Sequence, residues 1–180
     1  VDSKAQSIVE EAIKNKSIMS TDQNLEMGFS MIDLKGRILA TVGSRKPKTG
    51  NLLYDRANFA RRQPGSTIKP LAAYTPAIEE GMFNYSSLIP DEPLQIPAAN
   101  GGYKSWPNNW YKGYKGKVTL QWALEKSANA PAAQIINMLT PMKSYEFLTK
   151  KLGFTSLDSS DAVSLAALAT GGTHYGVTPR

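Results

Sequence analysis

The segment Pro-Gly-Ser-Thr-Ile-Lys-Pro, at positions 64–70, constrains the fold of this chain more than any other stretch. Its Pro-Gly pair interrupts the preceding backbone at a point where a helix can begin. The segment therefore predicts a helix from Ser66 to Gly81, disturbed by Pro70 and Pro76, which cannot donate a backbone hydrogen bond. The apolar residues along this helix indicate that it is buried in the centre of a domain.

Ser66 and Lys69 have the spacing of a nucleophile and its base. Residues three apart lie on one face of a helix, so the Lys69 amine can reach the Ser66 hydroxyl. Burial and nearby positive charge lower the pKa of a lysine, and its neutral amine can then deprotonate a serine. An ordinary helix start is the alternative, because Ser-x-x-Lys alone occurs by chance in a chain rich in both residues.

A second polar pair stands at Ser127 and Asn129, in the stretch Glu-Lys-Ser-Ala-Asn-Ala-Pro. Residues 119–124 and 130–139 are predicted to be short helices, so the pair falls in the loop between them. From such a loop a hydroxyl and an amide can face one cleft, where the hydroxyl relays a proton and the amide binds a substrate amide. A simple helix cap is the alternative for both residues.

With these two pairs, the chain resembles the transpeptidase domain of class A penicillin-binding proteins. Ser-x-x-Lys and Ser-x-Asn are motifs of such serine acyltransferases. Other segments that resemble the family are residues 1–6, 31–33, 36–40, 54–57, 106–110, 116–121, 171–173 and 176–179. The resemblance implies an α+β fold of the β-lactamase/transpeptidase type, with helices packed on both faces of a mainly antiparallel sheet.

The resemblance also implies a peptidoglycan D,D-transpeptidase that cross-links stem peptides through a serine acyl-enzyme and is acylated by β-lactams. Ser66, deprotonated by Lys69, would attack the carbonyl between the two terminal D-alanines. Ser127 would carry the proton to the leaving amine, and Asn129 would hold an amide of the stem peptide. The implied partners are stem peptides, their lipid-linked precursor and β-lactam antibiotics, and no cofactor is expected.

The third motif of the family, a Lys-Thr-Gly on a strand far downstream, has no match in its expected place. The literal Lys48-Thr49-Gly50 precedes the serine and is predicted to be a solvated loop. The resemblance therefore implies that residues 1–180 are the N-terminal portion of a transpeptidase domain. The downstream part, on the same or a second chain, is an expected partner, and the 180 residues alone are expected to be inactive. The resemblance places the domain on the extracytoplasmic face of the bacterial cell membrane, with an anchor outside this chain.

Residues 84–118 are rich in proline, glycine and asparagine and predict a long excursion with few regular elements. Tyrosines and tryptophans alternate there with lysines, as in proteins that stack on single-stranded nucleic acid. Because no nucleic-acid fold is recognisable, we expect no nucleic-acid partner. Trp110 is the first candidate to line a peptide cleft, with packing of the loop against the domain as the alternative.

Composition excludes several kinds of site. The chain has no cysteine, so disulfides and thiolate metal sites are unavailable, and no metal site is predicted. Its single histidine, His174, lies among glycines and predicts a surface turn rather than part of a Ser-His-Asp triad. The net charge of +6 comes from scattered basic residues, which favours solvated faces over a patch for polyanions. The sequence has no apolar run of about eighteen residues, the length that a membrane span needs.

Periodic patterns predict further elements on both sides of the motifs. Apolar residues at helical spacing between positions 5 and 13 predict an amphipathic helix of about fourteen residues, capped at Asp2 or Ser3. Residues 28–32 and 37–42 predict a hairpin at the edge of a larger sheet. A further helix is predicted to start at Thr-Pro, positions 140 and 141, and to end at a glycine, position 153.

Two other classes of function remain open. A D,D-carboxypeptidase or a serine β-lactamase shares both motifs but passes the acyl group to water. A class A lactamase also needs a deacylating glutamate after Ser-x-Asn, and residues 129–180 offer only Glu146, on a predicted helix. A non-catalytic penicillin sensor or wall-binding module would keep Ser66 without turnover. The rate of deacylation with a peptide acceptor distinguishes these possibilities.

Overall fold

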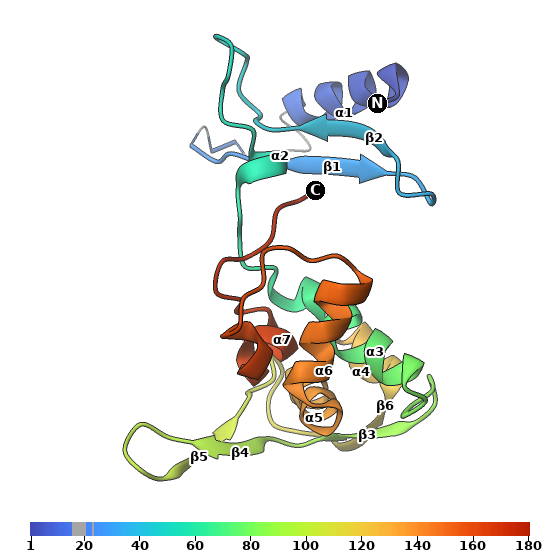
Figure 1. The fold of residues 1–180 in the computed structure, drawn as a ribbon, viewed down its shortest axis with the longest axis vertical. Coiled ribbons are helices and arrows are strands. Elements are labelled where there is room, and N and C mark those ends of the chain that lie inside the picture. The colour runs from blue at the N-terminus through green and yellow to red at the C-terminus, as the bar shows by residue number, and fades with distance from the viewer. Residues whose placement is uncertain (16–20, 23) are drawn as a thin grey trace. The chain divides into compact units, whose positions relative to one another are not determined.

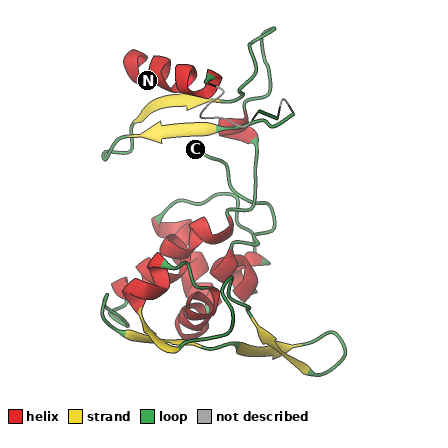
Figure 2. Cartoon of the chain, turned by 180° about the vertical axis from the view of Figure 1, so that it is seen from behind, coloured by secondary structure: helices red, strands yellow, loops and turns green. Residues whose placement is uncertain are grey.

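The computed structural model describes residues 1–15, 21–22 and 24–180. Helices and short antiparallel strands alternate along this part of the chain, which confirms the predicted α+β class (Figures 1 and 2). Within the described ranges, each helix is too short or too polar to cross a membrane.

The chain divides into two units, residues 1–62 with 177–180 and residues 63–176. All five predicted site residues belong to the second unit. The elements of the first unit are α1 (Ser3–Lys14), β1 (Phe29–Ile32), β2 (Ile38–Val42) and α2 (Arg56–Phe59).

In the first unit, α1 packs on the hairpin of β1 and β2 (Figure 1). The helix begins at Asp2, whose Oδ1 accepts a hydrogen bond from the Ala5 N–H over 2.9 Å. Val9 and Ile13 are buried on its inner face together with Ala40 of β2. The predicted amphipathic helix and hairpin are therefore confirmed. Among the described residues the hairpin pairs with no further strand.

In the second unit, helices surround α5, and two short antiparallel ladders lie along one side of them (Figure 1). Its helices are α3 (Thr75–Glu79), α4 (Leu120–Glu125), α5 (Asn129–Leu139), α6 (Pro141–Glu146) and α7 (Leu165–Thr170). Its strands are β3 (Leu88–Asp91), β4 (Leu94–Pro97), β5 (Tyr103–Trp106) and β6 (Gly116–Thr119). It also contains 3₁₀ turns at Gly65–Ile68 and Asp161–Val163 and π-helical segments at Pro70–Tyr74 and Phe147–Lys151.

The core of this unit forms around α5. Ile135 and Ile136 of α5 are completely buried and belong to one apolar cluster with Ile68, Leu148 and Leu168. Burying one such side chain stabilises a fold by about 1.5–3 kcal/mol. The residues just after Ser66 are thus fixed by packing against the centre of the unit.

The helix predicted after the Pro-Gly pair is present, but its winding changes from 3₁₀ to π to α before it ends at Glu79. Pro70 has no N–H group, and the Ser66 carbonyl accepts instead from the Lys69 N–H. The Thr75 N–H donates to the Pro70 carbonyl in the wider π turn. The prolines therefore disturb the helix without ending it, as predicted.

Residues 84–118 contain more regular structure than predicted. Four strands form here, and the prediction of few regular elements is wrong. The ladder of β3 and β6 joins residues far apart in sequence, with Asp91 opposite Gly116, and local composition does not reveal such a pairing. Pro90 and Pro97 are tolerated because a strand with one partner uses only half of its backbone groups.

Two predicted helix boundaries after the Ser-x-Asn stretch are confirmed. Thr140 precedes α6, and its Oγ1 accepts from the Lys143 N–H over 3.4 Å. The helical run that follows stops before Gly153, which has a φ of +72°. A glycine at the end of a helix adopts this left-handed conformation at little cost.

Candidate active site

Ser66 lies in the 3₁₀ turn at the start of the helical run. The preceding Gly65 has a φ of +56°, a conformation that favours glycine. Side chains three apart eclipse each other in a 3₁₀ turn. Ser66 and Lys69 therefore lie on one face, with Ser66 exposed and Lys69 only 1% exposed. The predicted reach of the Lys69 amine to the Ser66 hydroxyl stays a prediction, because the described partners of Lys69 Nζ are Ser127 and Asn129.

A second glycine supports the turn that carries Ser66. The Gly65 N–H donates to the carbonyl of Gly171 over 3.3 Å. Gly171 follows α7 with a φ of +77°, and a Cβ atom at this position would overlap the backbone of Gly65. Gln63 adds a hydrogen bond from Nε2 to the Thr173 carbonyl over 3.3 Å. The chain after α7 therefore fixes the backbone just before the serine.

Lys69 joins the two predicted polar pairs. Its Nζ donates to the Ser127 carbonyl and to Asn129 Oδ1, both over 2.6 Å, and to Ser127 Oγ over 3.2 Å. An ammonium group has three N–H donors, so these acceptors use all of them. Among the described residues none forms a hydrogen bond with Ser66 Oγ, which is free to approach a substrate carbonyl.

Burial lowers the pKa of Lys69 from 10.5 to about 8. The cause is desolvation, which penalises the charged ammonium more than the neutral amine. At pH 7 a lysine with this pKa is neutral in about a tenth of the molecules, far more often than an exposed lysine. The pKa of Lys69 is thus closer to the range in which a lysine acts as a base at neutral pH.

Ser127 lies between α4 and α5 in a left-handed conformation with a φ of +48°. A residue other than glycine pays about 1–3 kcal/mol for such a backbone. Its carbonyl and its hydroxyl both contact Lys69 Nζ, at 2.6 and 3.2 Å. This left-handed backbone therefore lets the carbonyl and the hydroxyl of Ser127 contact Lys69 Nζ at the same time.

Asn129 is the first residue of α5, which corrects the prediction that it lies in the loop before this helix. Its Oδ1 accepts from Lys69, and its Nδ2 donates to the Asn108 carbonyl over 2.8 Å. Both ends of the side-chain amide are therefore occupied in this structure. A substrate amide that binds Asn129 would replace or share one of these contacts.

Comparison with known proteins identifies the family. The family model for the penicillin binding protein transpeptidase domain matches residues 27–168 of this sequence. The chain belongs to this transpeptidase family. The matched range contains all five predicted site residues, and the resemblance to class A penicillin-binding proteins is confirmed.

Two curated relatives of this transpeptidase chain are bacterial penicillin-binding proteins. Penicillin-binding protein 1F of Bacillus subtilis is 38% identical over 181 residues, which cover 99% of this chain and 23% of that protein. Penicillin-binding protein 1A of Streptococcus pneumoniae is 30% identical over 179 residues, which cover 86% of this chain and 24% of that protein. The crystal structure of penicillin-binding protein 1A from Haemophilus influenzae aligns with a TM-score of 0.64 at 26% identity, over 83% of this chain and 21% of that one. The chain thus spans about a quarter of the length of these relatives.

Trp110 lies beside the Ser-x-Asn segment. Its Nε1 donates to the carbonyl of Lys126, directly before Ser127, over 2.7 Å. The ring meets Tyr111 edge to face with 5.5 Å between centroids, yet the residue is 70% exposed. The structure therefore places Trp110 at the edge of the site with most of its surface available, while its predicted contact with a peptide stays a prediction.

Sequence analysis missed Asn109, which supports Asn129 from a neighbouring loop. Asn109 Oδ1 accepts from the backbone N–H groups of Asn129 and Ala130, over 2.9 and 3.0 Å. The residue before α5 is Ala128, which has no side-chain oxygen to cap the helix. That missing cap is the signal in the sequence, but it does not show which distant residue supplies the acceptor.

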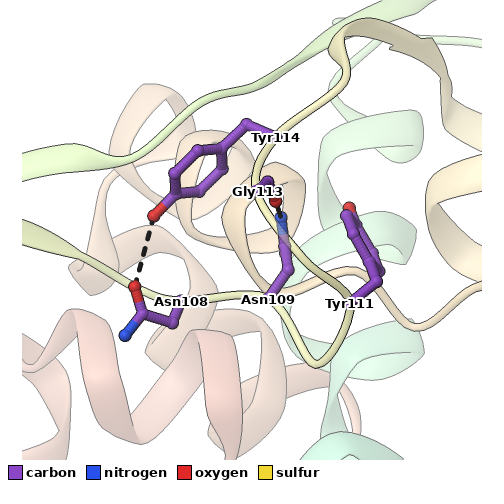
Figure 3. Close-up of a pocket in the computed structure, with 5 residues that line it drawn as sticks. All are labelled: Asn108, Asn109, Tyr111, Gly113 and Tyr114. Carbon is purple, nitrogen blue, oxygen red and sulfur yellow. Dashed lines mark hydrogen bonds between the residues drawn. The ribbon is translucent and has the colours of Figure 1, made fainter.

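Asn108 and Asn109 also line a shallow pocket of about 290 Å³ together with Tyr111, Gly113 and Tyr114 (Figure 3). In it the Asn109 Nδ2 faces the Gly113 carbonyl at 3.4 Å, and the Tyr114 hydroxyl donates to Asn108 Oδ1 at 3.4 Å (Figure 3). Two residues that line this pocket, Asn108 and Asn109, also hold Asn129.

Other candidate groups lie elsewhere. Residues 48–50, the literal Lys-Thr-Gly, are exposed and irregular, as predicted. His174 is also exposed, and its Nδ1 contacts Asp158 Oδ2 at 2.6 Å, while its ring stacks on Tyr175. Side-chain hydrogen bonds from Ser160 and His174 hold the pKa of Asp158 well below its usual range. Within the described part of the chain, no cluster of His, Cys, Asp and Glu side chains could hold a metal ion.

Proposed function

We propose that this chain carries the nucleophile of a peptidoglycan D,D-transpeptidase, which cross-links stem peptides through an acyl-enzyme on Ser66. The observation that carries the proposal is the buried Lys69 amine, which shares a helix face with Ser66 and contacts Ser127 and Asn129 at 2.6–3.2 Å. Family membership supports a role in building the cell wall.

The first step is acylation of the serine. Neutral Lys69 has two N–H donors, which suffice for its two 2.6 Å contacts with Ser127 O and Asn129 Oδ1. Its lone pair then accepts the proton of Ser66 Oγ as this oxygen attacks the carbonyl between the terminal D-alanines. The carbonyl carbon becomes tetrahedral, and its oxygen takes the negative charge.

The second step is departure of the last D-alanine. The proton gained by Lys69 is donated toward Ser127 Oγ, 3.2 Å away, while Ser127 passes its own hydroxyl proton to the leaving nitrogen. The carbon–nitrogen bond breaks, free D-alanine leaves, and an ester remains on Ser66. The amine of a neighbouring stem peptide then attacks this ester, returns a proton to Ser66 Oγ and completes the new amide bond.

Stabilisation of the tetrahedral intermediate needs two hydrogen-bond donors aimed at its oxygen. We propose that the Ser66 N–H is one donor and that the second comes from a downstream strand bearing the third motif. On this proposal residues 1–180 alone are inactive, and the rest of the domain completes the site. The domain would act outside the cytoplasmic membrane on stem peptides of the lipid-linked precursor.

Hydrolysis of the acyl-enzyme, as in a D,D-carboxypeptidase or a β-lactamase, has less support. Glu146 was the candidate for a deacylating carboxylate. It lies on α6, where its Oε1 pairs with Lys150 Nζ at 2.6 Å on an exposed surface. A penicillin sensor without turnover would retain acylation of Ser66 but would not transfer the acyl group to a peptide amine.

A fluorescent penicillin tests the proposed function directly. We would label the 180-residue chain and the same chain extended by the downstream domain, and then map the adduct by mass spectrometry. We expect a covalent adduct on Ser66 in the extended protein and no adduct in Ser66→Ala. A folded extended protein without an adduct on Ser66 would overturn the proposal.

A further inference from the structure

The N-terminus of α5 is capped by a side chain from another segment of the chain. The first N–H groups of a helix have no partner within it and need an outside acceptor. Ala128, the residue before α5, has none, and Asn109 Oδ1 accepts from the N–H groups of Asn129 and Ala130 over 2.9 and 3.0 Å. A single side-chain oxygen therefore fixes the backbone of Asn129.

The orientation of the Asn109 amide is determined by Asp91. The Asn109 Nδ2 donates to Asp91 Oδ1 over 2.8 Å. An ionised carboxylate only accepts hydrogen bonds, so the amide nitrogen must face Asp91 and the amide oxygen must face α5. A flipped amide would lose every one of these bonds.

Asp91 itself is buried and accepts hydrogen bonds from three donors. It is completely buried at the end of β3, opposite Gly116 of β6. Its second oxygen, Oδ2, accepts from the Tyr111 hydroxyl and from the Lys115 N–H, both over 2.8 Å. Together with the bond from Asn109, these contacts give a buried carboxylate three donors.

From these contacts we propose that Asp91 and Asn109 form a positioning pair, which holds Asn129 where its Oδ1 meets Lys69. The adjacent Asn108 assists, because its carbonyl accepts from Asn129 Nδ2 over 2.8 Å. The proposal rests on the proposed function, since its effect is on acylation of Ser66. Neither member touches the reacting atoms, and both act through Asn129.

The first test is removal of the acceptor in Asn109→Ala, made in the extended domain and assayed with the fluorescent penicillin. We expect acylation of Ser66 to slow by about tenfold to a hundredfold, the usual cost of losing a group that orients a catalytic residue. Asn100→Ala, on the exposed turn between β4 and β5, is the matched control and should acylate at the wild-type rate. A folded Asn109→Ala that acylates at the wild-type rate would contradict the proposal.

The second test reverses the polarity of the pair. Asn109→Asp alone sets two carboxylates against each other, and we expect slow acylation. In the double variant Asp91→Asn with Asn109→Asp, the new amide at position 91 donates to the new carboxylate. That carboxylate still accepts from the α5 N–H groups, and the amide oxygen at position 91 accepts from Tyr111 and Lys115. The contacts with α5, Tyr111 and Lys115 and the bond within the pair thus keep a donor and an acceptor. Only the 3.4 Å contact with the Gly113 carbonyl loses its donor, so we expect the double variant to recover most of the lost rate.

The pH profile distinguishes positioning from a purely structural role. The double variant moves a negative charge to the start of α5, next to the residue that contacts Lys69, so the midpoint of acylation should rise to higher pH. A double variant no faster than Asn109→Asp, or one with an unshifted midpoint, would overturn the proposal. If the single variants fail to fold, the acylation rate and pH midpoint of the double variant, compared with those of the wild type, still test the proposal. Failure of the proposed function would look different, because wild-type Ser66 would then carry no adduct.

Discussion

At the scale of single residues, the behaviour of the site depends on the protonation of Lys69. The amine is buried, its pKa is lowered to about 8, and no carboxylate among the described residues forms an ion pair with it. The motif made a lowered pKa the condition for Lys69 to act as a base, and the burial that lowers it appears only when α5 and the Ser127 loop are in place.

The rate of Ser66 acylation should therefore rise with pH. Burial disfavours the charged ammonium, so the neutral base becomes abundant as pH increases through about 8, the pKa of Lys69. We expect a sigmoidal increase between about pH 7 and pH 9, measured by stopped-flow with a fluorescent penicillin in the extended domain.

Lys69→Arg should lower the acylation rate by roughly 10²–10⁴-fold at every pH, because an arginine does not lose its proton. Lys150→Arg, an exposed exchange on the surface, serves as the control and should keep the wild-type profile. A flat profile in the wild type, or an active Lys69→Arg, would exclude Lys69 as the base.

At the scale of elements, two glycines from distant segments hold the turn before Ser66. Gly65 precedes the helix, and Gly171 follows α7, with a hydrogen bond between their backbones. Both glycines stand out in the sequence, but nothing in it indicates that they lie together. The close approach exists because Gly171 has no side chain, since a Cβ on Gly171 would overlap the backbone of Gly65.

Gly171→Ala should destabilise the protein and slow acylation of Ser66. The substitution combines a positive φ with overlap onto Gly65, and we expect a loss of about 2–4 kcal/mol in the free energy of unfolding. Gly81→Ala is the matched control, since Gly81 has a φ of +70° with nothing near its Cβ, and should cost only about 1 kcal/mol. Urea unfolding measures both values, and equal losses would show that the overlap is relieved without cost.

Local patterns predicted most helix ends and few strands. Asp2 and Thr119 cap α1 and α4 as expected, because a cap depends on residues within three positions of each other. β4 and β5 were missed although only residues 98–102 separate them, whereas β3 and β6 were missed because they pair across the whole excursion. Asn109, the most important contact of this stretch with α5, was missed for the same reason.

At the scale of the whole molecule, the described strands form only two-stranded ladders. Such ladders leave backbone groups unpaired along their outer edges. Sequence analysis predicted that the β1 and β2 hairpin is the edge of a larger sheet. We expect strands of a downstream segment to pair with this hairpin.

Hydrogen exchange tests the larger sheet. In the 180-residue chain, the outward-facing amides of β1 should exchange quickly, because no described strand accepts from them, whereas Thr41 of β2 already donates to Gln6 Oε1 over 3.0 Å. In a chain extended downstream, we expect those amides to become protected while the amides of α5 change little. Equal exchange in both chains would mean that the hairpin gains no partner strand.

The sequence alone determined the features that depend on neighbouring residues. These are the turn into the helix at Ser66, the helix caps, the glycine ends and the two motifs by which the family is recognised. Only the tertiary structure decided that Lys69 faces Ser127 and Asn129 and that Asn109 caps α5. Caps and turns arise from backbone preferences over a few residues, whereas burial, a shifted pKa and a borrowed cap arise from packing between distant segments.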